Sequence, residues 1–234
     1  MATTVSEIIS QAMIFIDDVR LKEQLNTNPA QFYRTMSAYV QAAMPMLNRP
    51  PELFSYISKE YVEPQFDATE WTATEQSLTE ETIVQTGFIG YDLCSVVIRS
   101  EDGMYETPYS DYTYDAETGD ITFAVQSQAG TIYVISVYKD GSVADLTYTM
   151  MKLFAQATTL IWYARFDNNW LNQQMKIHDS NYSTVNESSY TSKLSEKVAK
   201  KVQSFAEDLR KYEQDVTYNR VIPDVLKASA STLI

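Results

Sequence analysis

The sequence predicts an α+β fold: a mainly α-helical bundle, a small antiparallel β module inserted between its N-terminal and C-terminal helices, and an extended C-terminal tail. Apolar residues recur every three or four positions near both ends of the chain, which is the spacing of a helical face. Between residues 81 and 139, short β-branched and aromatic runs alternate with turn signals. We therefore expect residues 1–78 and 140–217 to form a helical bundle domain, 79–139 the inserted β module, and 218–234 a docking tail.

The opening segment predicts two helices and a short third one. The first covers Thr4 to Leu25, and Thr4 with Glu7 fits a capping box. The second begins at Asn28-Pro29, where the asparagine caps the helix and the proline takes its first position. We expect a short helix over Glu52 to Tyr61, followed by a polar, irregular stretch from Pro64 to Gln76.

The middle of the chain predicts the β module. Its expected strands are Thr82–Thr86, Leu93–Arg99, Thr113–Tyr114, Ile121–Val125 and Thr131–Tyr138. The strongest pairing signal is a hairpin in which Tyr112–Asp115 and Ile121–Phe123 are joined through Thr118-Gly119.

Two further helices are expected after the module. The longer runs from Ser142 to Ile177, about 50 Å at the rise of an α-helix. Its apolar residues cover more than one face, so it needs partners on several sides, from its own chain and from a neighbouring copy. A last helix runs from about Ser192 to Val216, where apolar residues again step by three or four.

The first half of this last helix holds a cluster of lysines: Lys193, Lys197, Lys200 and Lys201. Cations are unfavourable near a helix N-terminus. One interpretation is an electrostatic contact with an acidic partner or with the DNA backbone. The other is a solvated face with no partner.

The tail is too apolar for a disordered end. Its candidate partner-binding residues are Ile222, Val225, Leu226, Leu233 and Ile234. The tail either folds back on its own domain or docks on a neighbouring subunit.

Composition and motifs favour a non-catalytic protein with no cofactor. The net charge of −13 argues against a general DNA-binding surface. One cysteine, Cys94, and one histidine, His178, exclude an internal disulfide and a Cys/His zinc site. The acidic residues Asp17-Asp18 and those of the β turns are better explained by solvation and turn chemistry than by metal binding. No G-x-S-x-G motif or phosphate-binding glycine loop occurs.

Other composition features bear on location and contacts. Seventeen tyrosines suit either subunit interfaces or β-strands. The sequence predicts no signal peptide and no membrane span, and therefore a reducing, aqueous compartment.

One family resemblance emerges from these segments. Val5 to Arg49, with its Asp17-Asp18 helix end and Asn28-Pro29 restart, resembles the head–tail connector (adaptor) proteins of tailed bacteriophages, as do the central and last helices. The stretch from Tyr109 to Phe123 is similar to hairpins common in virion structural proteins.

The resemblance implies a structural ring component of the phage neck. It implies a homo-oligomer, a twelve-fold ring, between a portal protein and a tail or tail-terminator protein. DNA would pass through the lumen without sequence-specific binding, and an acidic lumen would let the duplex slide. The protein would be made in the host cytoplasm and reside at the head–tail interface of the virion. The alternative is a tail or baseplate binding subunit whose β module recognises a partner or a glycan.

Overall fold

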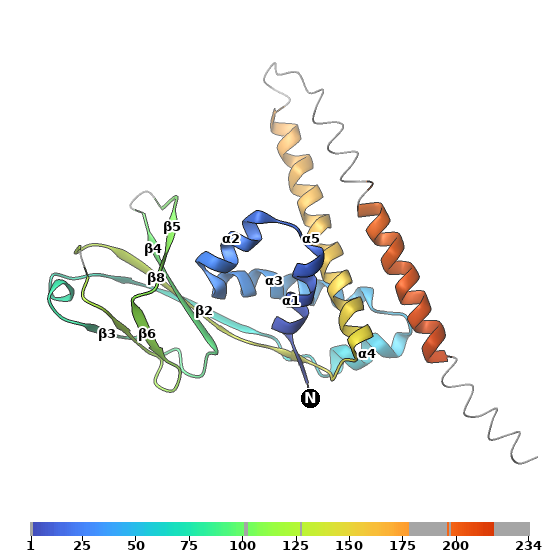
Figure 1. Cartoon of the computed structure of the whole chain (residues 1–234), viewed down its shortest axis with the longest axis horizontal. Helices are drawn as coiled ribbons and strands as arrows, with labels where there is room; N and C mark the ends of the chain where they lie inside the picture. Colours follow the sequence, from blue (N-terminus) through green and yellow to red (C-terminus); the bar gives the residue numbers. More distant parts are fainter. Residues whose placement is uncertain (1, 101–102, 127, 178–195, 197, 218–234) are drawn as a thin grey trace, which may run out of the picture.

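The computed structural model describes residues 2–100, 103–126, 128–177, 196 and 198–217. These residues form two parts that lie next to each other (Figure 1). We call the part made by the helices the helical unit, and the part made by the strands between residues 65 and 139 the β unit.

The elements alternate between these two parts along the chain. The helices are α1 (Val5–Phe15), α2 (Val19–Thr27), α3 (Pro29–Ala43), α4 (Pro51–Lys59), α5 (Tyr148–Ile177) and a C-terminal helix over residues 198–217, with short 3-10 turns η1 (Met44–Met46) and η2 (Gln76–Leu78). The strands are β1 (Thr3–Thr4), β2 (Gln65–Thr72), β3 (Thr82–Gln85), β4 (Leu93–Arg99), β5 (Glu106–Tyr109), β6 (Tyr112–Asp115), β7 (Asp120–Phe123), β8 (Ile132–Lys139) and β9 (Ser142–Val143).

The helical unit is held by one apolar core around α5. Helix α1 starts with the predicted capping box: the Thr4 hydroxyl accepts a hydrogen bond from the Glu7 N–H, and the Glu7 carboxylate accepts one from the Thr4 N–H. Helices α1 and α3 contact α5. The core includes the buried side chains Ile8, Ile9, Phe32, Met36, Val40, Leu153, Phe154, Ala157, Phe205 and Leu209. Because the C-terminal helix contributes Phe205 and Leu209, it packs on the same core as α1.

The β unit is a sandwich of two antiparallel sheets. One sheet has four strands in the order β2-β8-β4-β5, and the other has three in the order β3-β7-β6. Their facing sides enclose a second core that contains Ile121, Phe123 and Ile135. The Trp71 ring stacks on Phe123 with centroids 4.4 Å apart, so the edge strand β2 is tied to the opposite sheet.

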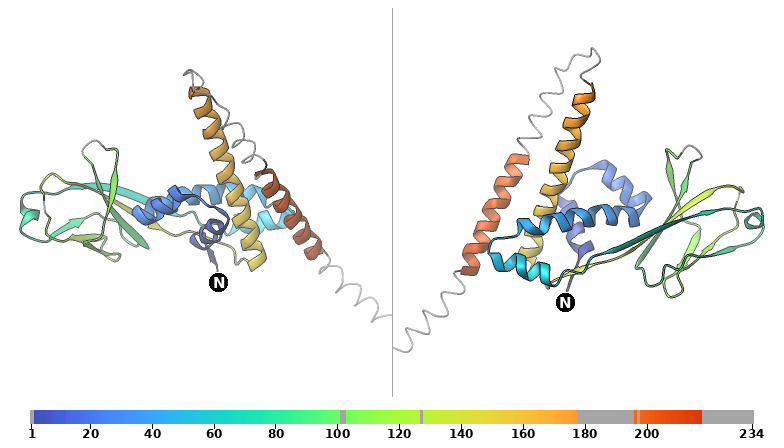
Figure 2. Two further views of the ribbon diagram at one scale, coloured as in Figure 1. Left: turned by 45° about the horizontal axis from the view of Figure 1, so that its top comes forward. Right: turned by 180° about the vertical axis from the view of Figure 1, so that it is seen from behind.

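Helix α3 joins the two units, because it contacts β2, β4 and β8 of the four-stranded sheet (Figure 2). At its start, the buried Ser95 hydroxyl donates to Asn28 Oδ1 at 2.7 Å and accepts from the Ala30 N–H at 3.3 Å. Farther along, the Ser37 and Tyr138 hydroxyls lie 3.2 Å apart. Buried polar groups placed in this way fix the helix against the sheet, because losing either partner leaves the other unsatisfied.

The prediction of a mainly α-helical bundle with a small inserted β module is wrong. The described residues form nine strands in three antiparallel sheets, so the fold is mixed. Strand β2 lies in the stretch from 64 to 76 that was expected to be irregular, and all eight of its residues pair with β8. It is an edge strand with exposed and half-buried side chains, so it lacks the run of buried β-branched residues that signals a central strand. Strands β1 and β9, which pair Thr3 with Val143, were also missed.

Two helix boundaries were also wrong. The expected helix from Thr4 to Leu25 is two helices, because Ile16 is extended and the Asp18 carboxylate caps α2 by accepting from the Arg20 N–H at 2.8 Å. Helix α5 begins at Tyr148, since Ser142 belongs to β9. The predicted hairpin is confirmed as β6–β7, with Gly119 at a φ of +75°. The division into a helical domain, an inserted module and a tail stays a prediction.

Candidate functional site

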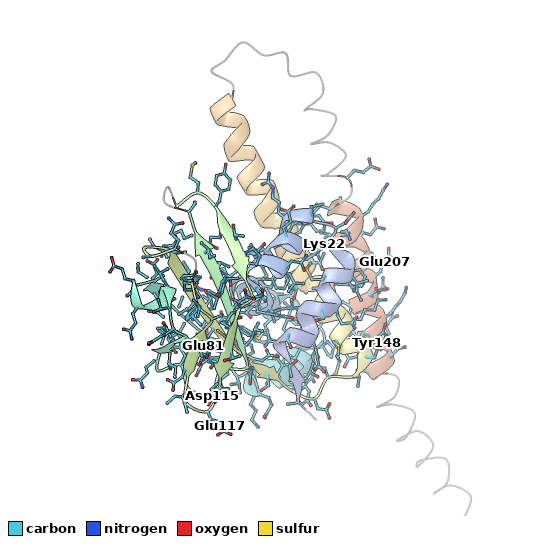
Figure 3. The ribbon with its side chains drawn as sticks, turned by 60° about the vertical axis from the view of Figure 1, so that its left-hand side comes forward. Lys22, Glu81, Asp115, Glu117, Tyr148 and Glu207 are labelled. Atoms are coloured by element: carbon cyan, nitrogen blue, oxygen red, sulfur yellow. The ribbon has the colours of Figure 1, made fainter. Side chains whose placement is uncertain are left out.

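The charge of the chain is concentrated in the β unit. Residues 65–139 hold thirteen acidic side chains and two basic ones, Arg99 and Lys139, whereas the rest of the chain holds eighteen acidic and sixteen basic ones. In Figure 3, Glu81, Asp115 and Glu117 lie on the β unit, with Asp115 and Glu117 at its lower edge, whereas Lys22 and Glu207 lie on helices. The helical unit is therefore close to neutral, and the β unit accounts for nearly all the net negative charge.

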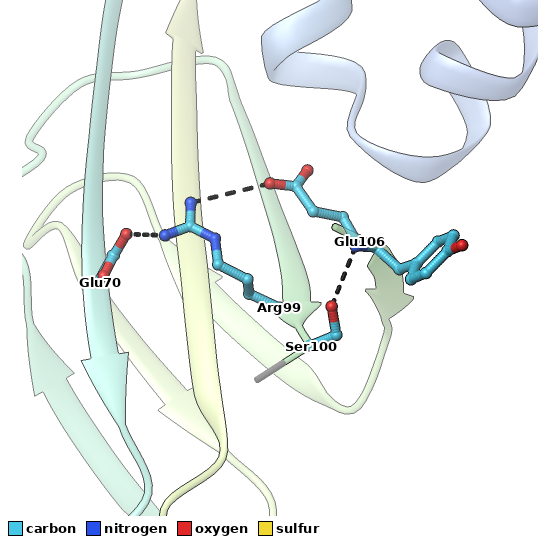
Figure 4. Close-up of polar contacts among 5 residues, drawn as sticks. Glu70, Arg99, Ser100 and Glu106 are labelled. Carbon is cyan, nitrogen blue, oxygen red and sulfur yellow. Dashed lines mark hydrogen bonds and ion pairs between the residues drawn. The ribbon is translucent and has the colours of Figure 1, made fainter. Parts of the chain in front are cut away.

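One of the two cations of the β unit, Arg99, pairs with carboxylates of the same sheet. The Arg99 guanidinium on β4 pairs with Glu70 of β2 and lies 3.9 Å from Glu106 of β5 (Figure 4). Because β8 separates β4 from β2, this side chain links three strands of the sheet. The pairs are partly exposed, so their contribution to stability is small, but they orient the base of the β4–β5 hairpin.

The tip of the β4–β5 hairpin presents two apolar side chains to solvent. We call Met104 and Tyr105 the hairpin tip; they are 76% and 71% exposed. Tyr105 is hydrogen-bonded to Ser100: the Ser100 N–H donates to the Tyr105 carbonyl at 3.0 Å, and the Tyr105 N–H donates to the Ser100 hydroxyl at 3.0 Å. Two hydrogen bonds therefore join Tyr105 to Ser100, next to the end of β4.

A cavity of about 250 Å³ lies where α3 meets β2 and β8. We call it the α3–β2 cavity. Its lining residues are Arg34, Ser37, Ala38, Gln41, Tyr61, Glu63, Pro64, Phe66 and Tyr138. The walls thus combine three aromatic rings with one guanidinium and one carboxylate, which suits an occupant that is part apolar and part polar.

The polar groups of the α3–β2 cavity differ in how far they are already satisfied. The Arg34 guanidinium carbon lies 4.5 Å from the centre of the Phe66 ring, and among the described residues no ion pair involves Arg34. By contrast, the Tyr138 hydroxyl donates to Asp140 at 3.1 Å and contacts Ser37. Burial, with a smaller contribution from the Glu63 charge, raises the pKa of Tyr61 to about 12. Burial also raises the pKa of Tyr138, so both phenols are neutral hydrogen-bonding groups at pH 7.

The structure separates the two predicted lysines that it describes. The Lys200 ammonium is exposed and pairs with Glu196 at 2.7 Å. The Lys201 ammonium lies 3.4 Å from the Phe15 carbonyl at the end of α1 and 5.3 Å from the centre of the Tyr163 ring. Lys201 thus faces its own chain, where a cation near a helix C-terminus is favourable. Lys193 and Lys197 lie outside the described residues, as do the tail residues Ile222, Val225, Leu226, Leu233 and Ile234.

The other titratable candidates have structural roles where they are described. Burial raises the pKa of the Cys94 thiol to about 12, so it is protonated at neutral pH. Asp17 pairs with Lys22 at 3.1 Å, and Asp115 accepts the N–H of Glu117 within a turn. In the part of the chain that the structure describes, no three His, Cys, Asp or Glu side chains are placed to share a metal ion. His178 lies outside that part.

Sequence reasoning missed the hairpin tip and the α3–β2 cavity. The tip had one signal, since a Met-Tyr pair directly follows the turn signal at Gly103. The cavity had none, because it brings helix residues such as Arg34 against Phe66 and Tyr138, which lie far away in the sequence.

No protein-family model matches the chain, and no curated protein matches it. None of the described helices is both long and apolar enough to cross a membrane.

Proposed function

We propose that this protein is a non-catalytic ring component of a tailed-phage neck, which joins the portal to the tail and forms part of the DNA channel. The observation that carries the proposal is the charge distribution: an acidic β unit attached to a nearly neutral helical unit. In a ring whose β units face the lumen, the carboxylates repel DNA phosphates, so the duplex passes without being held.

The helical unit supports the same proposal. The end of helix α5 extends beyond the body formed by α1, α2 and α3 (Figure 1). A projecting helix gives a neck component a second surface, remote from the β unit, for a portal or tail partner. In this proposal the protein resides at the head–tail interface of the virion as a twelve-fold homo-oligomer.

The test is electron microscopy of the purified full chain mixed with the portal protein of the same virus. We expect a ring of this chain stacked coaxially on the portal, with the β units towards the channel. Free portals beside single copies of this chain would refute the proposal.

A truncated variant tests the tail in this assembly. Removing residues 218–234 should abolish attachment to the neighbouring ring and leave the melting temperature of the remaining chain unchanged. A truncated protein that still stacks on the portal would show that the tail residues, including Ile222 and Leu226, are not the docking segment.

A second candidate function is recognition of a partner or a glycan by the β unit of a tail or baseplate subunit. It is favoured by the 71% exposure of Tyr105 at the hairpin tip, since exposed aromatic rings are common recognition groups. A chain that stays monomeric at high concentration, and that binds its partner through Tyr105 as a monomer, would favour this function over the ring.

A further inference from the structure

We propose that the hairpin tip of one copy docks in the α3–β2 cavity of the next copy, with Tyr105 as the inserted side chain. The inference rests on the proposed ring and specifies the contact that joins its subunits. It is argued from the shape of the tip, the chemistry of the cavity and the positions of the two surfaces.

The exposure and the backbone hydrogen bonds of Tyr105 favour insertion of its side chain into a neighbouring molecule. Tyr105 is 71% exposed, yet both its backbone N–H and its carbonyl are hydrogen-bonded to Ser100. At the base of the hairpin, Arg99 links β4 to β2 and β5. Inserting a side chain whose own backbone is already hydrogen-bonded costs less conformational entropy than inserting one from an unbonded backbone.

The cavity has the right size for a phenol ring. An apolar cavity of about 150 Å³ can hold benzene. The α3–β2 cavity measures about 250 Å³, which leaves room for the hydroxyl and for part of Met104. At its mouth, α3 presents the small exposed side chain of Ala38, so the entrance on the helix side is open.

The polar groups of the cavity select tyrosine over a simple ion. Arg34 would attract an inserted carboxylate, but Glu63 would repel it, and a lysine would meet the opposite conflict. A phenol satisfies both groups, because its ring face accepts a guanidinium and its hydroxyl donates to a carboxylate. Tyr105 therefore matches a cavity whose cation has no ion pair among the described residues.

The two surfaces belong to different parts of the molecule. The tip lies at the end of β4 and β5, and the cavity lies between α3, β2 and β8. A contact between unlike surfaces is heterologous, so each copy keeps a free tip and a free cavity after binding one neighbour. Repetition of such a contact closes into a ring when the rotation between copies is suitable.

Cysteine cross-linking of the full chain tests the contact. We expect the double variant Met104→Cys with Gln41→Cys to form a covalent ladder of three or more copies under mild oxidation. Each single variant should form none of these higher species. The native Cys94 competes poorly for disulfide formation with the introduced cysteines, because its raised pKa keeps the thiol protonated. Absence of the ladder from the double variant would overturn the contact.

Complementation distinguishes this contact from other ways of associating. Tyr105→Ala removes the inserted ring, and Ala38→Glu obstructs the mouth of the cavity while keeping a helix-forming residue. We expect each variant alone to associate about tenfold or more weakly than the unaltered chain in sedimentation velocity. An equimolar mixture should form heterodimers and nothing larger, because one intact tip meets one intact cavity.

The matched control is Tyr148→Ala, since Tyr148 is 73% exposed and lies at the start of α5. It should associate like the unaltered chain. A Tyr105→Ala protein that associates normally would overturn the contact. If that variant still forms a ring on the portal, the proposed function stands and only this contact is refuted. If the unaltered chain forms no ring under any of these conditions, both are refuted.

Discussion

At the residue scale, Asp140 shows how one carboxylate can tie the two units together. Its side chain accepts the N–H of Ser6 in the first turn of α1 and the hydroxyl of Tyr138 on β8. Its own N–H donates to the Asp92 carboxylate at 2.8 Å. A negative charge at the start of a helix is favourable. The N–H of the same residue connects the end of β8 to the loop before β4.

Gly119 is a residue whose identity is required by its backbone and by its neighbour. Its φ is +75°, and a Cβ at this position would lie 2.7 Å from the backbone nitrogen of Phe88. We expect Gly119→Ala to lower the free energy of unfolding by about 2–4 kcal/mol, measured in urea. Gly90→Ala is the control, because its φ is +76° and no atom lies within 4 Å. Equal losses in the two variants would show that the contact with Phe88 does not matter.

The two described lysines of the predicted cluster are expected to differ in their effect on stability. Lys201→Met removes a cation from the Phe15 carbonyl and the Tyr163 ring, and should cost about 1 kcal/mol. Lys200→Met breaks one exposed ion pair, so it should change stability by less than about 0.5 kcal/mol. Thermal unfolding of the two variants measures the difference. A larger loss for Lys200→Met would contradict the assignment of Lys201 to the interior contact.

At the element scale, α5 has a buried segment that the whole helical unit depends on. Leu160 is 6% exposed and belongs to the core that α1 and α3 share with α5. Leu160→Asp should unfold the helical unit at 25 °C, because an unpaired carboxylate in an apolar core costs several kcal/mol. Ala164→Asp places the same side chain on an exposed position of the same helix and should leave circular dichroism unchanged. A folded Leu160→Asp protein would mean that this face of α5 is not part of the core.

Elements with a local signal were predictable from the sequence, and an edge strand without such a signal was not. The β6–β7 hairpin is carried by neighbouring residues and a glycine turn, so Tyr112 to Phe123 could be assigned directly. Strand β2 is defined by pairing with β8, for example Phe66 opposite Tyr138, and its own half-exposed sequence gives little indication of it. The α3–β2 cavity depends on that same pairing, which explains why the candidate site escaped prediction.

At the scale of the whole molecule, the charge separates the two units, whereas the packing joins them. The acidic residues are concentrated in the β unit, yet α3 fixes that unit to the helices through Ser95, Asn28 and Tyr138. A rigid junction lets a docked neighbour position the acidic surface, since a movement at the hairpin tip is not absorbed by a flexible linker. This is why one contact per subunit could set the orientation of the β units in the proposed ring.

The phenols of Tyr61, Tyr112 and Tyr138 make the stability of the whole molecule depend on pH in the alkaline range. Burial, followed by the neighbouring Cys94, raises the pKa of Tyr112 to about 12, and burial also raises those of Tyr61 and Tyr138. In the unfolded chain a tyrosine titrates near pH 10. Between pH 10 and about 12 the unfolded state therefore releases protons that the folded state retains, so the free energy of unfolding falls as the pH rises. Below about pH 9 these groups contribute no pH dependence.

Urea unfolding at pH 8, 10 and 11 measures this fall, and tyrosinate absorbance reports the titration itself. Tyr112→Phe should lose about 1 kcal/mol at pH 8, because its hydroxyl no longer donates to the Cys94 carbonyl, and it should then fall less steeply between pH 10 and 11. The exposed Tyr148→Phe should keep the slope of the unaltered chain. Identical slopes for Tyr112→Phe and Tyr148→Phe would show that Tyr112 titrates normally in the folded protein, and would remove it from the groups that couple the fold to pH.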